Sequence, residues 1–378
     1  MDGATPAKKR IIFLISDTGG GHRSAATAIV EAANVLYPGR FDCKIIDFLR
    51  DYYPFPFRYA PEIYPSLEKL GAWGPTFKML DGKGRAVAAV QLTYPLMRNG
   101  IRRLLEENPS DLIVSVHPLV NSTLPKAMRH KPEPFITVVT DMVSVHALWY
   151  DRHADLVVVP TELAKQRALR FGVPEGNLRV VGLPVAEAFR HLPADSAPFR
   201  ADHGWDPDLP VALLVGGGDG MGPLRRVAKA INKRQLPLTL AVVCGRNAEL
   251  KADLEAVDWK IPTHLYGFTD QMPQFMAASD ILITKAGPGT ISEAFIAKLP
   301  LVLFSRVPGQ EDGNVDYVCD HGAGVWAPHP GDVADALEDW LANPAKLAAA
   351  RNASAALARP DSSRQIAAII AAHLGVRD

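Results

Sequence analysis

Residues 11–26, IIFLISDTGGGHRSAA, hold the pattern from which the fold is inferred. Five apolar residues end at Ser16, three glycines follow, and an alanine-rich segment begins after His22. A strand, a glycine-rich turn and a helix in this order are typical of the start of a Rossmann-like domain. The backbone N–H groups of such a turn can approach an anion closely, and the helix N-terminus adds partial positive charge.

The same arrangement occurs a second time, where an apolar strand leads into the glycine cluster GGGDGMGPL at 216–224. In both halves, short β-branched runs alternate with longer helical patterns, which predicts parallel sheets covered on both faces. We therefore expect an α/β protein with two Rossmann-like domains. The predicted strands are residues 11–15, 43–47, 112–116, 135–139 and 156–159, then 211–215, 238–243, 263–266, 280–283 and 301–304.

The two halves join near residues 184–208, a stretch rich in Pro, Ala and Asp with little strand character. We expect an N-terminal domain over 1–190 and a C-terminal domain over 191–360. The remaining residues, 361–378, form an alanine-rich helical segment that can cross back to the N-terminal domain.

An insertion at residues 50–103 interrupts the alternation between the second and third strands. It holds nine aromatic residues, and nine Lys and Arg against four Asp and Glu. Such a segment can lie on a membrane, because aromatic side chains bury at the headgroup boundary and basic ones attract anionic lipid. Phe55, Phe57 and Trp73 are the expected membrane-contacting residues. The alternative is a helical insertion whose aromatic residues pack as core.

His22 stands at the mouth of the first glycine turn, where a purely structural turn has little need of an imidazole. Its unperturbed pKa of about 6.5 suits a general base at neutral pH. The chain has neither a GxGxxG nor a GxxxxGK[ST] spacing, so a dinucleotide or P-loop site is not indicated. A tight turn without a ligand is the alternative for the glycines.

The cluster TKAGPGTISEAFIAKLP, residues 284–300, follows a strand of the second half. A glycine-rich helix start at this edge of a parallel sheet is where nucleotide phosphates bind. Thr290 and Glu293 also match the capping box S/T-x-x-E. Glu293 therefore has two competing interpretations, as a ligand-binding carboxylate or as the cap of its own helix.

The loop PGQEDGN, residues 308–314, places Gln310, Glu311 and Asn314 after another strand. Amide and carboxylate groups suit a hydroxyl-rich ligand, since each can donate to or accept from paired OH groups. Taken alone, the loop is better explained as an ordinary polar loop.

Composition excludes several classes of protein. Basic and acidic residues are balanced at 41 each, so overall charge predicts no nucleic-acid partner. Three widely spaced cysteines form neither a disulfide framework nor a zinc motif, and we expect no metal and no cofactor. No apolar run approaches the length of a membrane span, and the N-terminus lacks the apolar core of a signal peptide.

Six blocks, taken together, resemble one family: SDTGGGHRSAA, VGGGDGMGPL, CGRN, GFTDQM, TKAGPGTISEA and PGQEDGN. Over about residues 11–326 the chain is similar to the monogalactosyldiacylglycerol synthase and diacylglycerol glucosyltransferase family. It is more distantly similar to the peptidoglycan lipid II N-acetylglucosaminyltransferase. The resemblance implies a GT-B fold, with two Rossmann-like domains facing across a cleft. It also implies inverting transfer of galactose or glucose from a UDP-sugar to the hydroxyl of diacylglycerol.

The resemblance further implies that the C-terminal domain holds the donor. Phe268 would lie at the uracil, largely through its backbone, and Glu293 would accept from the ribose hydroxyls. It implies that Pro288, Gly289 and Thr290 face the phosphates and that Gln310, Glu311 and Asn314 lie around the sugar. The remaining implied donor-binding residues are the glycines Gly20, Gly21, Gly218 and Gly245.

For catalysis, the resemblance implies that His22 is the base, and we expect a carboxylate such as Asp141 or Asp17 to orient it. The stretch TDMVSVHALWY is similar to a TD…H…W pattern of the family. This similarity places Asp141, His146 and Trp149 near the acceptor side of the cleft.

The chain begins almost directly at its first predicted strand, without a plastid transit segment. We expect a bacterial-type or mature protein in the cytoplasm, held peripherally on the inner face of the cell membrane by anionic lipids. Three alternatives stay open: a polyprenyl-diphosphate-linked acceptor, a non-catalytic nucleotide-sugar-binding subunit, and a UDP-sugar epimerase of similar shape. Retention of His22 argues against the second. The sequence does not distinguish glucose from galactose, which differ at one hydroxyl.

Overall fold

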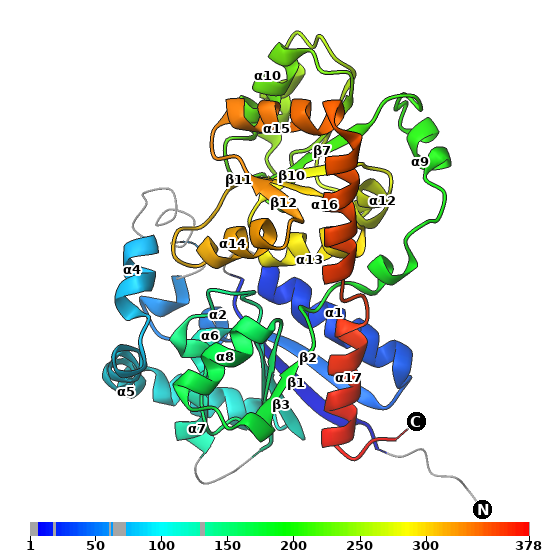
Figure 1. The fold of residues 1–378 in the computed structure, drawn as a ribbon. Coiled ribbons are helices and arrows are strands. Elements are labelled where there is room, and N and C mark those ends of the chain that lie inside the picture. The colour runs from blue at the N-terminus through cyan, green and yellow to red at the C-terminus, as the bar shows by residue number, and fades with distance from the viewer. Residues whose placement is uncertain (1–6, 18–19, 60–61, 63–72, 129–132, 378) are drawn as a thin grey trace, which may run out of the picture. The chain divides into compact units, whose positions relative to one another are not determined.

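A computed structural model describes residues 7–17, 20–59, 62, 73–128 and 133–377, and Figure 1 shows its helices and strands. The chain divides into two compact units. The first holds the described residues up to Glu187 together with Val307–Gln310 and the segment from Asp361 onward. The second holds Ala188–Arg306 and Glu311–Pro360.

A six-stranded sheet forms the centre of the first unit, in the order β2-β1-β3-β4-β5-β6, and every pairing in it is parallel. The chain leaves β1 for β2 on one side and then returns to place β3 on the other side. The topological switch point therefore lies between β1 and β3. The strands are β1 (Lys9–Ile15), β2 (Phe41–Asp47), β3 (Leu112–Ser115), β4 (Phe135–Val138), β5 (Leu156–Val159) and β6 (Leu178–Val180).

Helices cover both faces of this sheet, because alternate side chains of each strand point to opposite faces. On β1, Ile12 and Leu14 enter one buried cluster, and Phe13 and Ile15 enter another. The described helices are α1 (Gly21–Leu36), α2 (Phe48–Tyr52), α4 (Trp73–Leu80), α5 (Lys83–Glu107), α6 (Pro118–Asn121), α7 (Leu124–Ala127), α8 (Glu162–Phe171) and α17 (Ser362–His373), with short 3-10 turns η1 (Phe57–Tyr59), η3 (Ala147–Trp149), η4 (Glu175–Asn177) and η5 (Glu187–His191).

The C-terminal helix α17 belongs to the first unit. Figure 1 shows it beside α1, and Ile366 and Ile370 share a buried cluster with Ile29 of α1. The hydroxyls of Ser362 and Ser363 donate to backbone carbonyls at residues 183 and 185. The start of α17 is thus fastened to the segment that leaves the N-terminal sheet.

The second unit repeats the plan with the sheet order β12-β11-β10-β7-β8-β9, again parallel throughout. Its switch point lies between β7 and β10. The strands are β7 (Val211–Val215), β8 (Thr239–Val243), β9 (Thr263–Tyr266), β10 (Ile281–Lys285), β11 (Leu301–Ser305) and β12 (Gly324–Trp326), and the helices are α9 (Ala197–Asp202), α10 (Leu224–Arg234), α11 (Ala248–Glu255), α12 (Met272–Ala277), α13 (Pro288–Ile296), α14 (Asp312–Asp320), α15 (Pro330–Ala342) and α16 (Pro344–Leu357).

The predicted α/β fold is confirmed, and each predicted strand is present with its ends shifted by at most two residues. Two strands were not predicted, β6 and β12. Each has three residues and lies at the edge of its sheet, so neither carries enough residues to show a periodicity.

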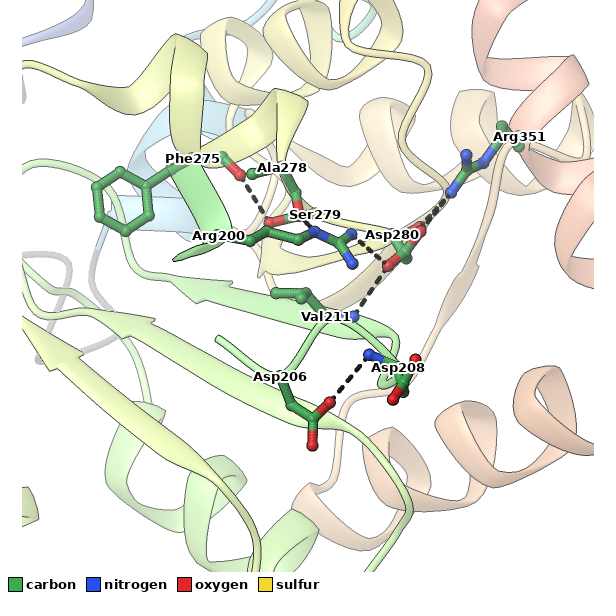
Figure 2. Close-up of polar contacts among 9 residues, drawn as sticks. All are labelled: Arg200, Asp206, Asp208, Val211, Phe275, Ala278, Ser279, Asp280 and Arg351. Atoms are coloured by element: carbon green, nitrogen blue, oxygen red, sulfur yellow. Dashed lines mark hydrogen bonds and ion pairs between the residues drawn. The ribbon is translucent and has the colours of Figure 1, made fainter. Parts of the chain in front are cut away.

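One carboxylate organises the amino-terminal edge of the second sheet. Figure 2 shows Asp280, which precedes β10, accepting from Arg200 of α9 at 2.9 Å and from Arg351 of α16 at 3.0 Å. The backbone N–H of Val211, at the start of β7, donates to the same carboxylate at 2.9 Å. Arg200 Nε also donates to the carbonyl oxygen of Ala278 at 2.9 Å. Asp280 therefore joins α9, α16 and two strands of the sheet.

The insertion between β2 and β3 supplies α2, α4 and the long helix α5. One face of α5 buries Met97, Ile101 and Leu104 in the core of the first unit. A Cβ atom on Gly100 would lie 2.0 Å from the carbonyl oxygen of Tyr52, so glycine is what allows α5 to approach α2 this closely. In the part of the chain that the structure describes, no helix is both long and apolar enough to cross a membrane.

Candidate functional site

The first glycine turn leads directly into α1 at the switch point of the first sheet. Gly20 is the N-cap of α1 with φ of 76°, a left-handed conformation that favours glycine. Among the described residues, a Cβ atom on Gly20 or Gly21 would meet no atom within 4 Å. The backbone N–H groups at the start of α1 can therefore be approached closely, as an anion site requires. Thr18 and Gly19, also part of the predicted turn, lie outside the described residues.

His22 is the second residue of α1, and its half-buried side chain is surrounded by aromatic rings and one hydroxyl group. Its Nδ1 lies 3.0 Å from Oγ1 of Thr140, which follows β4. The ring of His117, which follows β3, meets it edge-on with centroids 4.6 Å apart, and the ring of Trp149 lies 6.1 Å away. The segments after β3 and β4 thus supply the surroundings of an imidazole that follows β1.

The charge state of His22 follows from these surroundings. Burial lowers the pKa of the imidazole to about 4, although the backbone of Val116 and the charge of Asp17 act in the opposite direction. At neutral pH the ring is therefore uncharged and has a lone pair available to accept a proton. The imidazole can act as a base in this state.

The two carboxylates expected near this imidazole have partners of their own. Asp17 accepts two hydrogen bonds from the guanidinium of Arg23, at 2.7 and 2.8 Å. Asp141 is buried and accepts from Trp149 Nε1 at 2.6 Å and from Gln310 Nε2 at 3.1 Å. The side chain at hydrogen-bond distance from the imidazole nitrogen is instead the threonine hydroxyl.

His146 and Trp149, expected on the acceptor side, are both buried. Trp149 has no exposed surface and packs in the core of the first unit. Nδ1 of His146 accepts from the backbone N–H of Leu148 at 3.1 Å, and the ring meets that of Phe77 edge-on at 4.7 Å. Burial lowers the pKa of His146, so its ring is uncharged at neutral pH. Trp149 holds Asp141 in position through the hydrogen bond from its Nε1.

In the second unit, the predicted glycines Gly218 and Gly245 lie against each other. The backbone N–H of Arg246 donates to the carbonyl oxygen of Gly218 at 2.9 Å, and a Cβ atom on Gly245 would lie 2.3 Å from that oxygen. The loops after β7 and β8 are locked together by this contact. Phe268, in the loop after β9, is 60% exposed, and the guanidinium of Arg246 lies 4.5 Å from its ring centroid.

The helix start after β10 differs from the predicted capping box. Helix α13 begins at Pro288 with Gly287 as its N-cap, so Thr290 is the third helical residue and the prediction that it caps the helix is wrong. Proline is favoured at the first helical position, where its missing N–H is not needed. A Cβ atom on Gly289 would meet nothing within 4 Å among the described residues, so this helix start can also be approached.

Because Thr290 is not the N-cap of α13, a capping role no longer explains the carboxylate of Glu293. In the described part of the chain its carboxylate makes no hydrogen bond or ion pair, and burial alone raises its pKa to about 7. The carboxyl group of Glu293 can therefore gain or lose a proton close to neutral pH. A half-buried carboxylate without a protein partner is suited to accept hydrogen bonds from a ligand.

The polar side chains of the loop after β11 form two separate sets of contacts. Glu311 is 4% exposed and accepts from Nζ of Lys285 at 2.7 Å. Asn314 is 1% exposed, and its Nδ2 donates to the carbonyl oxygen of Ala286 at 2.9 Å. Both side chains therefore hold the segment that leads into α13. Gln310 belongs to the first unit, where its Nε2 donates to Asp141.

The residues expected to touch a membrane differ in their exposure to solvent. Phe55 is 79% exposed, whereas Phe57 is partly buried against the core of the first unit, and the side chain of Trp73 lies outside the described residues. Helix α5 adds an exposed apolar pair that was not predicted: Leu92 is 80% exposed and Leu96, one turn later, is 61% exposed.

Four residues of these sites were not singled out from the sequence: Thr140, His117, Arg246 and Lys285. Each ends a strand or follows one within three positions. The carboxyl ends of parallel strands share one edge of the sheet, so this position was the available signal. In the residues that the structure describes, no group of three or more His, Cys, Asp and Glu could hold a metal ion.

Comparison with known families divides the chain in the same way. Residues 22–185 match the family model for monogalactosyldiacylglycerol synthase, and residues 211–366 match that for the glycosyltransferase family 28 C-terminal domain. Monogalactosyldiacylglycerol synthase 3, chloroplastic, of Arabidopsis thaliana is 36% identical over 347 residues, which cover 89% of this chain and 75% of the relative. Probable monogalactosyldiacylglycerol synthase 2, chloroplastic, of Oryza sativa subsp. japonica is 35% identical over 352 residues, with 89% and 74% covered.

Solved structures share the architecture at low identity. The MurG structure from Acinetobacter baumannii has a TM-score of 0.59 at 16% identity and covers 96% of this chain and 99% of its own. The UDP co-structure of S. aureus MnaA has a TM-score of 0.66 at 15% identity, with 98% of both chains covered. These likenesses show the GT-B fold, and the sequence relatives show that this chain belongs to the monogalactosyldiacylglycerol synthase family of glycosyltransferases.

Proposed function

We propose that this protein transfers galactose or glucose from a UDP-sugar to the hydroxyl of diacylglycerol, inverting the anomeric carbon to give a β-glycosyl-diacylglycerol. The observation that carries the proposal is the similarity to monogalactosyldiacylglycerol synthases over 89% of the chain, with His22 placed at the first switch point. The relatives' names supply the acceptor and galactose, and a neighbouring structure, HepE of Anabaena, was solved with UDP and glucose. The donor and the inversion are our inference.

The uncharged imidazole of His22 is suited to take the proton from the acceptor hydroxyl as the oxygen attacks the anomeric carbon. The hydroxyl of Thr140 can donate to Nδ1 or accept from it, so this contact can hold the ring plane in either tautomer. A diphosphate at the start of α13 would be stabilised by the helix N-terminus as negative charge develops on the leaving group.

The first test is the reaction itself. Purified protein is given UDP-galactose or UDP-glucose with diacylglycerol in mixed micelles, and we expect glycolipid from at least one donor. His22→Ala should lower turnover by roughly 10²–10⁴-fold, with UDP affinity changed by no more than a few-fold. Turnover of the UDP-sugar without any lipid would instead indicate an epimerase. Transfer only to a polyprenyl-diphosphate-linked acceptor would show that diacylglycerol is not the acceptor.

A second test addresses the role of Thr140. Thr140→Val removes the hydroxyl at nearly constant volume, and we expect turnover to fall about 10-fold with the KM for the UDP-sugar unchanged, because only the orientation of the base is lost. Thr137→Val, on the strand β4 that precedes Thr140, is the matched control, since Oγ1 of Thr137 is buried without a hydrogen-bond partner in the structure. Equal activities of the two variants would exclude a positioning role for Thr140.

A third test uses the raised pKa of Glu293. If ribose hydroxyls donate to this carboxylate, UDP binding favours its ionised form and lowers a pKa that is about 7 in the free protein. Binding should therefore release protons below about pH 7, and this release should disappear at higher pH, where the free carboxylate is already ionised. Calorimetry in buffers of different ionisation enthalpy measures the protons released.

Because UDP itself titrates near this range, the decisive quantity is the difference between wild type and Glu293→Gln. The variant should bind UDP about 10-fold or more weakly and lose the extra proton release. Glu249→Gln, on the exposed surface of α11, is the control and should behave as wild type. An unchanged proton balance in Glu293→Gln would remove Glu293 from the donor site.

We also propose that the protein reaches its lipid through α5 and Phe55. Leu92 and Leu96 form an exposed apolar pair, and the exposed Arg98 and Arg102 follow on the same helix. Apolar side chains bury at the headgroup boundary and basic ones attract anionic lipid, so binding should be stronger to anionic vesicles and partly reversed by salt.

Flotation with vesicles of defined composition tests this surface. Replacing Leu92 and Leu96 together by Ser should release most of the bound protein. The same double change at Leu163 and Leu169, also exposed but on α8, is the matched control and should leave binding intact. If both double variants float like wild type, α5 is not the attachment surface.

A further inference from the structure

We infer that Lys285 is the cation that holds the diphosphate of the donor, and that Glu311 is its counter-ion while the site is empty of nucleotide. The inference rests on the proposed function, because it names a residue for the leaving group of that reaction. Lys285 is the last residue of β10, and β10 and β7 flank the switch point of the second sheet. Ligands of open parallel sheets bind at this point.

The side chain of Lys285 runs between the two loops that leave these strands. Its Cε atom lies 4.0 Å from the position of a Cβ atom on Gly217, in the loop after β7. Its Nζ atom lies 3.3 Å from the position of a Cβ atom on Gly287, the N-cap of α13. The ammonium group is therefore placed beside a helix N-terminus, so that the two sources of positive charge act on the same space.

Gly287 supports this assignment. Its backbone, with φ of −70° and ψ of 131°, is extended, and residues of any type adopt it. Backbone conformation does not explain the glycine, and a Cβ atom would make a tight contact, 3.3 Å, with the Lys285 ammonium. The glycine thus leaves room for the cation at the start of α13.

The contact between Lys285 and Glu311 is also better explained by ligand binding than by stability. Nζ and Oε1 are 2.7 Å apart, with the side chain of Glu311 5% exposed and that of Lys285 21% exposed. A buried ion pair adds little net stability, because the loss of hydration offsets most of the attraction. The pair does hold the ammonium near α13 until an anion of the ligand arrives.

The balance of the transfer step shows why a cation is needed here. The bond between the anomeric carbon and the β-phosphate oxygen breaks, and its electron pair stays on that oxygen. The acceptor oxygen forms the new bond to the anomeric carbon, and its proton passes to His22. The diphosphate gains negative charge as it leaves, and Lys285 with the N-terminus of α13 would stabilise this charge.

Calorimetry with uridine, UMP and UDP separates a contact to the diphosphate from a general loss of structure. In Lys285→Met we expect UDP to bind about 10- to 100-fold more weakly. The affinity for UMP should fall by a smaller factor, and uridine should bind as in wild type. Lys285→Arg, which keeps the charge, should recover most of the UDP affinity. Lys229→Met, on an exposed position of α10, is the control for loss of a surface charge and should bind all three ligands normally.

Because Lys285→Met leaves Glu311 buried without this partner, the double variant Lys285→Met/Glu311→Gln is measured beside it. The double variant should fold as wild type and still show the selective loss of UDP. An unchanged UDP affinity in both variants, or an equal loss for uridine and UDP, would overturn the assignment. If wild type binds none of the three ligands, the proposed UDP-sugar donor is contradicted. If wild type binds UDP and Lys285→Met binds it equally well, only the inference about Lys285 is contradicted.

Discussion

All the candidate chemistry of this protein depends on the parallel pairing of its strands. A parallel sheet needs a crossover after every strand, so each carboxyl end reaches the same edge, and the sheet must be covered by helices on both faces. In the first unit this constraint brings His22, His117 and Thr140 together from the ends of three neighbouring strands. In the second unit it brings Lys285 beside the glycine loop that follows β7. Nothing in the local sequence of any one of these segments produces the site.

Desolvation acts on both sites in the same sense, although the groups have opposite charges. It lowers the pKa of His22 and raises that of Glu293, so both are moved towards their neutral forms at neutral pH. An uncharged imidazole can accept a proton, and a carboxyl group near its midpoint responds strongly to a hydrogen-bonding ligand. Burial therefore keeps the imidazole of His22 uncharged, and it brings the carboxyl group of Glu293 into a pH range in which a ligand can change its protonation.

The sequence was sufficient for the parts of the structure that long, local patterns determine. The apolar strands of four or more residues, the two glycine turns and the position of the insertion could all be read from it, whereas the three-residue edge strands β6 and β12 could not. The capping box at Thr290 failed because the proline before it already begins the helix. Hydrogen-bond partners were the least predictable feature. Asp141 takes the indole of Trp149, a pairing that depends on how η3 folds back towards β4.

The contacts of Asp280 have a mechanical consequence. Arg200 lies in the segment that enters the second unit after Glu187, and Arg351 lies in the helix that leaves it before Asp361, and both end on this one carboxylate. At the other end, the same two segments are joined by the serine hydroxyls at the start of α17. Two of the covalent connections between the units therefore form a double tether that is pinned at both ends. Loss of the Asp280 carboxylate would therefore release both segments together at their ends in the second unit.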